Sequence, residues 1–226
     1  MKKRFFISSA LLLTLFLLTA CSSNSQPSRI EFPNNINNLP EKNMKKEEMI
    51  NRDILSKYSQ AEFKTNLGSF TIEFFNDKMP ETVANFLNLA DQGYFNGIKF
   101  HRVIAGFMIQ AGDPLTKDDS QEGRWGTGGP GYVIADEHVA GLSNLRGTIS
   151  MANAGPNSGG SQFFINLVDN TFLDFDKEPS SSKHPVFGQV ISGMEVVDNI
   201  SQVETNFPGI LDRPVEAVVI EEIILK

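Results

Sequence analysis

Short apolar stretches with the spacing of β-strands run along the chain from Ala61 to Lys226. Phe70, Ile72 and Phe74 alternate with polar residues, which is the period of a half-buried strand. Further short apolar runs, separated by glycine-rich turns, predict additional strands. These runs are Ile98–Ile104, Thr148–Met151, Phe163–Leu167, Val186–Val190 and Val218–Leu225. Many short strands with few helices favour a closed β-barrel or a sandwich over alternating βαβ units.

Two segments have helical spacing instead. Pro80 suits the first position of a helix, and apolar residues recur with a helical period from there to Gly93, which ends the pattern. Residues 194–200 predict a second, short helix. Neither an internal repeat nor a linker interrupts residues 61–226, so we expect them to form one domain.

The first twenty residues have a different pattern. Lys2, Lys3 and Arg4 precede an unbroken apolar run, Ala10 to Leu18, whose only polar member is Thr14. Such a run is too short to span a hydrocarbon core of ~30 Å as a mature helix, and its basic start is typical of secretory signal peptides. We therefore expect residues 1–20 to be a signal peptide.

The apolar run ends in Leu18-Thr19-Ala20-Cys21, which is similar to the lipobox of bacterial lipoproteins. This similarity implies that Cys21 is diacylated on sulfur and becomes the new N-terminus. Two acyl chains make a stable anchor where one is marginal, at ~0.8 kcal/mol per buried methylene. We expect a protein held on the extracytoplasmic face of a cell membrane. An ordinary cleaved signal with an incidental cysteine is the alternative.

Residues 21–60 read as a flexible tether that follows the lipidated cysteine. The segment begins rich in Ser, Asn and Pro and then becomes charged. A flexible coil of this length spans roughly 35 Å, enough to keep the domain clear of a lipid surface. Near its end, Ile50, Ile54, Leu55 and Tyr58 have helical spacing, and they could form a short amphipathic helix on the domain.

Composition and charge narrow the classes of function. Among 226 residues, 20 Lys and Arg stand against 27 Asp and Glu, a net charge of -7. Loss of residues 1–20 lowers the net charge from -7 to -10, because it removes Lys2, Lys3 and Arg4 and no acidic residue. An acidic chain without clusters of basic residues is not expected to bind nucleic acid. The single cysteine excludes an intramolecular disulfide, a CxxC redox pair and a zinc cage.

Two motifs resemble ligand sites, but their contexts do not fit. Gly126–Gly131 matches G-x-G-x-x-G, yet the residues after it are wrong for the helix that a pyrophosphate site requires. Asp174, Asp176 and Glu178 alternate like calcium ligands, yet they lack the glycine and terminal glutamate of an EF-hand, so we expect a solvated acidic loop. We expect neither a cofactor nor a metal.

Aromatic residues are almost all phenylalanine, 18 against 3 Tyr and 1 Trp, which predicts a Phe-rich core.

Four blocks of the sequence resemble a known family. Residues 100–113 read FHRVIAGFMIQAGD, residues 126–129 GTGG, residues 151–165 MANAGPNSGGSQFFI and residues 184–188 HPVFG. In this order they resemble the cyclophilin family of peptidyl-prolyl cis-trans isomerases, over the whole of Ala61 to Lys226. The resemblance implies a mainly β fold, an eight-stranded antiparallel β-barrel capped by two α-helices.

The resemblance also implies an enzyme that rotates X-Pro bonds, here in secreted or cell-envelope proteins during their folding. Arg102 matches the catalytic arginine of the family, and its guanidinium stays charged at any pH. Other matched positions form the proline pocket or bind the substrate backbone. They are His101, Phe107, Met108, Gln110, Ala152, Asn153, Ala154, Gln162, Phe164, Phe172, Leu173 and His184.

One departure from the family pattern leaves a second function open. Phe172 stands where many members carry the tryptophan that contacts cyclosporin, which argues against tight binding of that drug. The segment between Leu173 and His184 is also long for the family. Both features suit the alternative of a proline-peptide-binding chaperone with weak isomerase activity. Proline-containing unfolded or exported polypeptides are the expected partners in either case, and we expect a monomer.

Overall fold

The computed structural model of the protein describes residues 50–178, 183–206 and 212–226. The expected signal peptide, Cys21 and most of the expected tether lie outside the described residues. Within the described ranges, no helix has the length and apolar character needed to cross a membrane.

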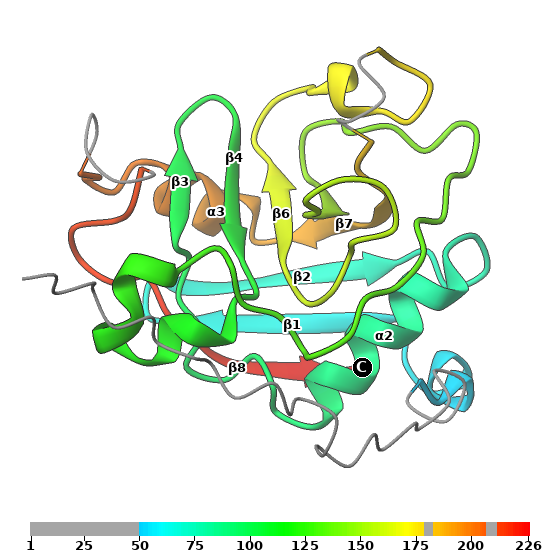
Figure 1. The fold of residues 1–226 in the computed structure, drawn as a ribbon, viewed down its shortest axis with the longest axis horizontal. Helices are drawn as coiled ribbons and strands as arrows, with labels where there is room; N and C mark the ends of the chain where they lie inside the picture. Colours follow the sequence, from blue (N-terminus) through cyan, green and yellow to red (C-terminus); the bar gives the residue numbers. More distant parts are fainter. Residues whose placement is uncertain (1–49, 179–182, 207–211) are drawn as a thin grey trace, which may run out of the picture. The chain divides into compact units, whose positions relative to one another are not determined.

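Eight described strands form one antiparallel sheet in the order β3-β4-β6-β5-β7-β2-β1-β8 (Figure 1). The strands are β1 (Gln60–Thr65), β2 (Gly68–Phe74), β3 (Arg102–Ile104), β4 (Met108–Ala111), β5 (Thr148–Met151), β6 (Phe163–Asn166), β7 (Val186–Ser192) and β8 (Ile220–Leu225). In β2 the residues predicted to face inward, Phe70, Ile72 and Phe74, are all buried. The expected eight-stranded antiparallel fold is confirmed.

The two ends of the strand order meet where residues just before β3 bond to Val218 and to Ile220, the first residue of β8. The amide of Gly97 donates to the carbonyl of Ile220 at 2.8 Å, the amide of Ile220 donates to Ile98 at 2.8 Å, and the amide of Phe100 donates to Val218 at 2.9 Å. These bonds satisfy backbone groups that an open sheet edge would leave unpaired. They curl the sheet into a barrel whose first strand, β3, carries Arg102.

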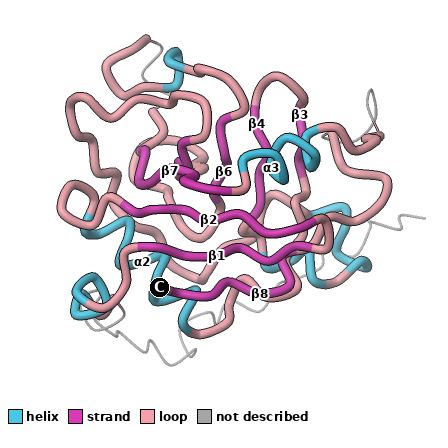
Figure 2. Tube along the Cα trace, turned by 180° about the vertical axis from the view of Figure 1, so that it is seen from behind, coloured by secondary structure: helices cyan, strands magenta, loops and turns pink. Residues whose placement is uncertain are grey.

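Two α-helices in the described part cover the sheet, α2 (Pro80–Asp91) and α3 (Met194–Ser201). Both match the predicted segments, and Pro80 occupies the start of α2 as expected. Seen from behind in Figure 2, α3 lies against β2 and the β3-β4 pair, whereas α2 lies beside β8. The short 3₁₀ helices are η2 (Arg52–Ser56), η3 (Pro114–Lys117), η4 (Asp119–Arg124) and η5 (Thr171–Leu173).

The domain includes the end of the segment that the sequence assigns to the tether. Ile50 and Ile54 are buried in the main apolar core, and η2 lies against α2. The side chain of Asn88 on α2 donates to the carbonyl of Asn51 at 3.0 Å. The apolar spacing at Ile50 to Tyr58 therefore reflects packing on the domain, which begins before residue 61.

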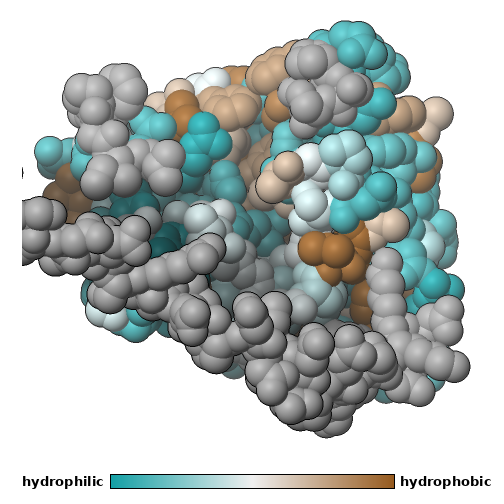
Figure 3. All heavy atoms as spheres, viewed as in Figure 1, coloured by the Kyte–Doolittle hydropathy of each residue, from teal (hydrophilic) through white to brown (hydrophobic). Residues whose placement is uncertain are grey.

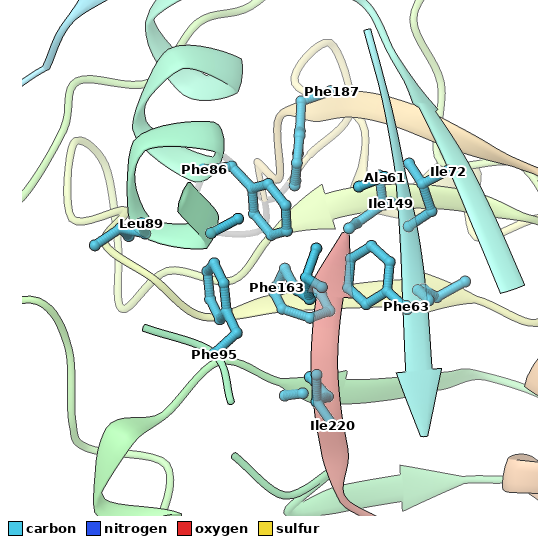
Figure 4. Packing of buried hydrophobic residues seen from close by; sticks show 14 of the residues in the cluster. Ala61, Phe63, Ile72, Phe86, Leu89, Phe95, Ile149, Phe163, Phe187 and Ile220 are labelled. Atoms are coloured by element: carbon cyan, nitrogen blue, oxygen red, sulfur yellow. The ribbon is translucent and has the colours of Figure 1, made fainter. Parts of the chain in front are cut away.

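Phenylalanine rings fill the centre of the barrel, as the composition predicts. Figure 4 shows Phe86 of α2 pointing among Phe63, Phe95, Phe163 and Phe187, which come from four other parts of the chain. The ring of Phe86 stacks on Phe95 with centroids 4.8 Å apart and meets Phe163 edge-on at 5.7 Å. Such aromatic pairs add about 0.5–1.5 kcal/mol each beyond their burial, so the core is tied together across helix and sheet.

Two strands have no clear apolar alternation in the sequence. In β1 the buried positions include Ala61 and Thr65 beside Phe63, so small and polar residues conceal the pattern. In β4 both Met108 and Ile109 are buried, because this part of the sheet is covered on both faces. The apolar run at residues 98–104 forms a strand only from Arg102, and Ile98 and Phe100 are buried outside it.

A distant carboxylate completes the N-terminus of α2. Met79 precedes the helix and provides no side-chain cap, whereas the Glu137 carboxylate accepts from the amides of Glu81 at 3.1 Å and Thr82 at 2.6 Å. A carboxylate here satisfies orphan N–H groups and interacts favourably with the helix dipole. We predict that Glu137→Ala lowers the free energy of unfolding by about 1–2 kcal/mol, measured by chemical denaturation.

The matched control for this prediction is Glu216→Ala, which removes an exposed carboxylate. It should change the free energy of unfolding by no more than about 0.5 kcal/mol. Equal losses in the two variants would contradict the capping role of Glu137.

Candidate active site

Strands β4 and β6 have one face on the barrel core and the other on a second apolar cluster. Successive side chains of a strand point to opposite faces. Ile109 and Phe163 accordingly lie in the main core, whereas Met108 and Phe164 form a separate cluster with Leu173 of η5. The main core holds the barrel together, and the second cluster is available to form a site.

A cavity of about 300 Å³ lies over this second cluster. Met108, Phe164 and Leu173 form its apolar part, with Phe107 and Ala152 packed beside them. Nine of the sequence-predicted site residues line the cavity together, namely Arg102, Phe107, Met108, Gln110, Ala152, Asn153, Phe164, Leu173 and His184. In the space-filling view, hydrophobic residues gather along the upper edge of the face seen in Figure 1, and hydrophilic residues lie in the hollow below them (Figure 3).

Arg102 supplies the charged group of this cavity. It pairs with Gln110 of β4 in the register of the sheet, which directs both side chains to the face of the cavity. No carboxylate in the described ranges forms an ion pair with its guanidinium. A guanidinium has five N–H donors, so Arg102 can donate to a ligand without first breaking a salt bridge.

His184 and Asn153 line the same cavity and come from outside the β3-β4 pair. A ring nitrogen of His184 lies 3.0 Å from the carbonyl oxygen of Met151, and its ring meets Phe164 edge-on with centroids 5.3 Å apart. Burial lowers the pKa of His184 from its ordinary value. The side-chain amide of Asn153 donates to the carbonyl of Lys183 at 2.7 Å. Both side chains are thus held in place by backbone carbonyls.

A second cavity, of about 440 Å³, adjoins the first and shares Gln110, Ala152 and Asn153 with it. The predicted residues Ala154 and Gln162 line this second cavity. The side-chain amide of Gln110 donates to the side-chain oxygen of Gln162 at 3.0 Å. Gln162 donates in turn to the carbonyls of Gly126 and Gly128, at 3.0 and 2.9 Å. This chain of amides fixes the glycine loop beside the cavity that holds Arg102.

Asp113 holds the same glycine loop in place through hydrogen bonds from backbone amides. Its carboxylate is fully buried and accepts from the amides of Leu115, Gly126 and Gly128. A Cβ on Gly128 would lie 2.0 Å from the Asp113 Oδ1 atom, so only glycine allows this approach. Sequence reasoning missed Asp113. Its position before Pro114 indicates a helix cap, but nothing in the sequence pairs it with the loop.

Two of the predicted substrate-binding residues lie outside the two cavities. His101 precedes β3 and points away from Arg102 into the protein, where it is 3% exposed. Phe172 is 56% exposed, and its ring stacks on Phe107 at a centroid distance of 6.0 Å. It lies at the rim of the first cavity, next to a residue that lines it. Cys21 lies outside the described residues.

The prediction of a solvated acidic loop is wrong for Asp174. Asp176 and Glu178 are exposed, but Asp174 is 8% exposed and accepts hydrogen bonds from Ser143 and Asn144. Its neighbour Leu173 is buried in the apolar cluster, and Asp174 is therefore buried as well. Its alternation with the other two acids in the sequence gave no indication of this burial.

Comparison with known proteins identifies the family of this chain. The sequence model for the family described as cyclophilin type peptidyl-prolyl cis-trans isomerase/CLD matches residues 60–224. The chain belongs to the cyclophilin family. The observed sheet and its two covering helices agree with the fold that the sequence blocks imply for a cyclophilin.

Similar proteins are named as peptidyl-prolyl cis-trans isomerases. Peptidyl-prolyl cis-trans isomerase B of Escherichia coli (strain K12) is 45% identical over 166 residues, which cover 71% of this chain and 96% of that protein. Peptidyl-prolyl cis-trans isomerase-like 1 of Aspergillus fumigatus is 44% identical over 157 residues, 69% of this chain and 88% of that protein. The protein is a cyclophilin-type peptidyl-prolyl cis-trans isomerase.

A solved structure of a cyclophilin type isomerase is also similar to this structure. The cyclophilin type peptidyl-prolyl cis-trans isomerase of Cryptosporidium parvum, determined in the presence of the dipeptide Ala-Pro, has a TM-score of 0.63 and 29% sequence identity. The match covers 74% of this chain and 98% of that one.

His101 makes the stability of this cyclophilin depend on pH. Burial lowers the pKa of His101 to about 4, with Arg213 and Arg102 acting in the same direction and Asp113 opposing them. Between pH 6.5 and 4 the unfolded chain binds a proton at this residue and the folded chain does not, so stability falls as the pH falls. We predict that from pH 7 to 4.5 the wild type loses about 2 kcal/mol more free energy of unfolding than His101→Gln.

The measurement is denaturant unfolding at both pH values, and His138→Gln is the control, because the side chain of His138 is partly exposed. The His138 variant should lose as much stability as the wild type over this range. If the His101 variant did the same, burial of a neutral His101 would not be the cause.

Proposed function

We propose that this protein is a lipid-anchored cyclophilin that accelerates rotation of X-Pro bonds in secreted or cell-envelope proteins, on the extracytoplasmic face of a membrane. The isomerase site that we propose is the cavity lined by Arg102, Met108 and Phe164. The single observation that carries it is that Arg102, which has no ion pair among the described residues, lines a cavity over an apolar cluster. The location rests on the leader and on Cys21.

The reaction makes and breaks no covalent bond. An X-Pro bond prefers trans by only about 0.5–1 kcal/mol, but its rotation crosses a barrier of ~18–20 kcal/mol because amide resonance is lost on the way. A catalyst therefore needs neither nucleophile nor base. It must bind the twisted amide better than either planar form, and each tenfold acceleration requires about 1.4 kcal/mol of that preference.

Arg102 is the proposed source of this preference. As the amide twists, its nitrogen regains a lone pair that the planar form delocalises, and the guanidinium can donate to this nitrogen and to the proline carbonyl. Both bonds are charge-assisted, and such bonds are about twice as strong as neutral ones. Because β3 holds the backbone of Arg102 in the sheet before the substrate arrives, less reorganisation is required when the bond rotates.

The apolar residues hold the proline ring while the bond turns. Met108, Phe164 and Leu173 offer a small closed surface against which the ring can pack and exclude water. Gln110, Asn153 and His184 bring polar groups to the same cavity, where they can bind the peptide backbone on either side of the proline. The stacked pair Phe107 and Phe172 extends the apolar surface at the rim.

The test of the isomerase site is Arg102→Ala in the domain that the structure describes, followed by NMR exchange between cis and trans forms of a short X-Pro peptide. We predict that kcat/KM falls by about 10²-fold or more, the loss typical of removing a donor aimed at the transition state. Arg102→Lys keeps the charge but not the planar fork of donors, so it should recover only part of the rate.

The control for this test is Arg124→Ala, which removes an exposed side chain whose hydrogen bond in the described part of the chain goes to Gln121. It should retain the wild-type rate. Equal exchange with and without the wild-type protein would refute the proposal. If the wild type is slow and Arg102→Ala suppresses aggregation of an unfolded client as well as the wild type, the peptide-binding chaperone is the better description.

The membrane location has its own test in the full chain, expressed in a bacterium with its leader. We predict that the wild type sediments with membranes and is released by detergent, because two acyl chains on Cys21 provide a stable anchor. Cys21→Ser should move to the soluble fraction, and Ser25→Ala should behave as the wild type. Mass spectrometry should show the diacyl group on residue 21. Retention of Cys21→Ser in the membrane fraction would contradict lipid anchoring at this residue.

A further inference from the structure

One side of the Arg102 cavity is formed without any strand. Met108 and Phe164 come from β4 and β6, whose hydrogen bonds hold them in register. Leu173 comes from the three-residue helix η5, and His184 lies before β7 begins. The amide of His184 donates to the carbonyl of Leu173 at 3.0 Å, so the two residues form one unit. Something other than sheet pairing must hold this unit against the strands.

A buried polar network lies on the same sheet face, next to the apolar cluster. Asn166 follows Phe164 on β6 with the same orientation, because side chains alternate along a strand. Asn144, Asn166 and Asn170 are each at most 2% exposed. The side chain of Asn170 donates to Asn166 at 2.8 Å, and that of Asn166 donates to Asn144 at 3.3 Å. Such groups are costly to bury unless they are paired, so their positions are tightly determined.

Asn170 connects η5 to Phe107, the residue before β4. Its side-chain amide also donates to the carbonyl of Phe107 at 2.9 Å. Its backbone amide donates to the carbonyl of Asn144 at 2.7 Å, and its own carbonyl accepts from the amide of Leu173 at 2.9 Å. One residue thus bonds both Phe107 and Leu173, and both of these line the cavity.

Asp174 holds the other end of η5. Its carboxylate accepts from the backbone amide of Asn144 at 2.7 Å, from the Asn144 side chain at 2.9 Å and from the hydroxyl of Ser143. The Asn144 side chain also donates to the carbonyl of His184 at 3.3 Å. Asn144 therefore bonds to Asp174 and to His184, the two residues that flank Leu173 in space.

We propose that Asp174, acting with Asn170 through Asn144, is a positioning residue for proline isomerisation. The network sets the separation between Leu173 and His184 on one side and Met108 and Phe164 on the other, so that the cavity fits a proline ring before substrate binds. Asp174 touches no substrate in this arrangement. A misplacement of about 1 Å in a positioning group can cost 10²-fold in rate. This inference rests on the isomerase site proposed above.

A carboxylate suits this position better than an amide. The Asp174 carboxylate accepts from the backbone and side-chain amides of Asn144 at Oδ1 and from the Ser143 hydroxyl at Oδ2. An amide of the same size could accept at Oδ1 and donate to the Ser143 hydroxyl, but its bonds would lose the charge that makes hydrogen bonds to a carboxylate about twice as strong. We expect Asp174→Asn to loosen η5 without creating a cavity, because the two side chains have almost the same volume.

The experiment measures kcat and KM by NMR exchange of an Ala-Pro peptide over a range of peptide concentrations. It is done well below the melting temperature and scaled to the folded fraction from circular dichroism. Asp174→Asn should lower kcat/KM by about tenfold or more, with a rise in KM. Asn170→Ala should act in the same direction, because it cuts the bond to Phe107. Asp176→Asn is the control, since it removes the same charge from an exposed residue of the same loop and should keep the wild-type values.

A role confined to fold stability would lower the melting temperature and leave kcat/KM per folded molecule unchanged. A folded Asp174→Asn variant within twofold of the wild type would overturn the inference. If that variant does not fold, Asn170→Ala decides by the same criterion, and failure of both to fold would assign the network to the fold and not to the cavity. No acceleration by the wild type would refute the proposed function itself, which is a different result.

Discussion

The pairing of β4 with β6 is the contact on which the barrel core and the cavity both depend. Its register places Ile109 opposite Ile165 and Gln110 opposite Phe164. Because side chains alternate, Ile109 and Ile165 fill the barrel and the neighbouring Met108 and Phe164 form the floor of the cavity. A slip of one residue would exchange these two sets, so the selection for a stable core also specifies the site.

Barrel closure extends this constraint to the charged group. β3 is short, but it pairs with β4 on one side, and the residues before it bond to Val218 and to Ile220 at the start of β8. Arg102 is therefore held by a strand with partners on both sides, and it faces the cavity without an ion pair among the described residues. His101, one position earlier, faces inward, where burial keeps it neutral down to low pH. Arg102 thus faces the cavity and His101 faces the interior, because successive side chains point to opposite sides of the sheet.

The parts of the site without strands depend on buried polar side chains. Asp113 holds the glycine loop of the second cavity through backbone amides, and Asp174 and Asn144 hold η5 and His184 beside the first. In each case an acidic group accepts several N–H bonds in a place that water does not reach. Such arrangements are strong only when every member is satisfied, which makes them specific for a single geometry.

The sequence alone determined the local elements and the chemistry of the motifs. The alternation at Phe70 to Phe74 and the helical spacing after Pro80 predict β2 and α2, because the period of buried positions is a local property. β4 and the burial of Asp174 were decided only by the tertiary structure. Met108 is buried because a loop from residues 171–173 covers the sheet there, and Asp174 is buried because Ser143 and Asn144 meet it from far along the chain. Contacts between distant segments leave no period in the sequence, which is why single elements could be predicted from spacing, the barrel only through the family resemblance, and the support of the site not at all.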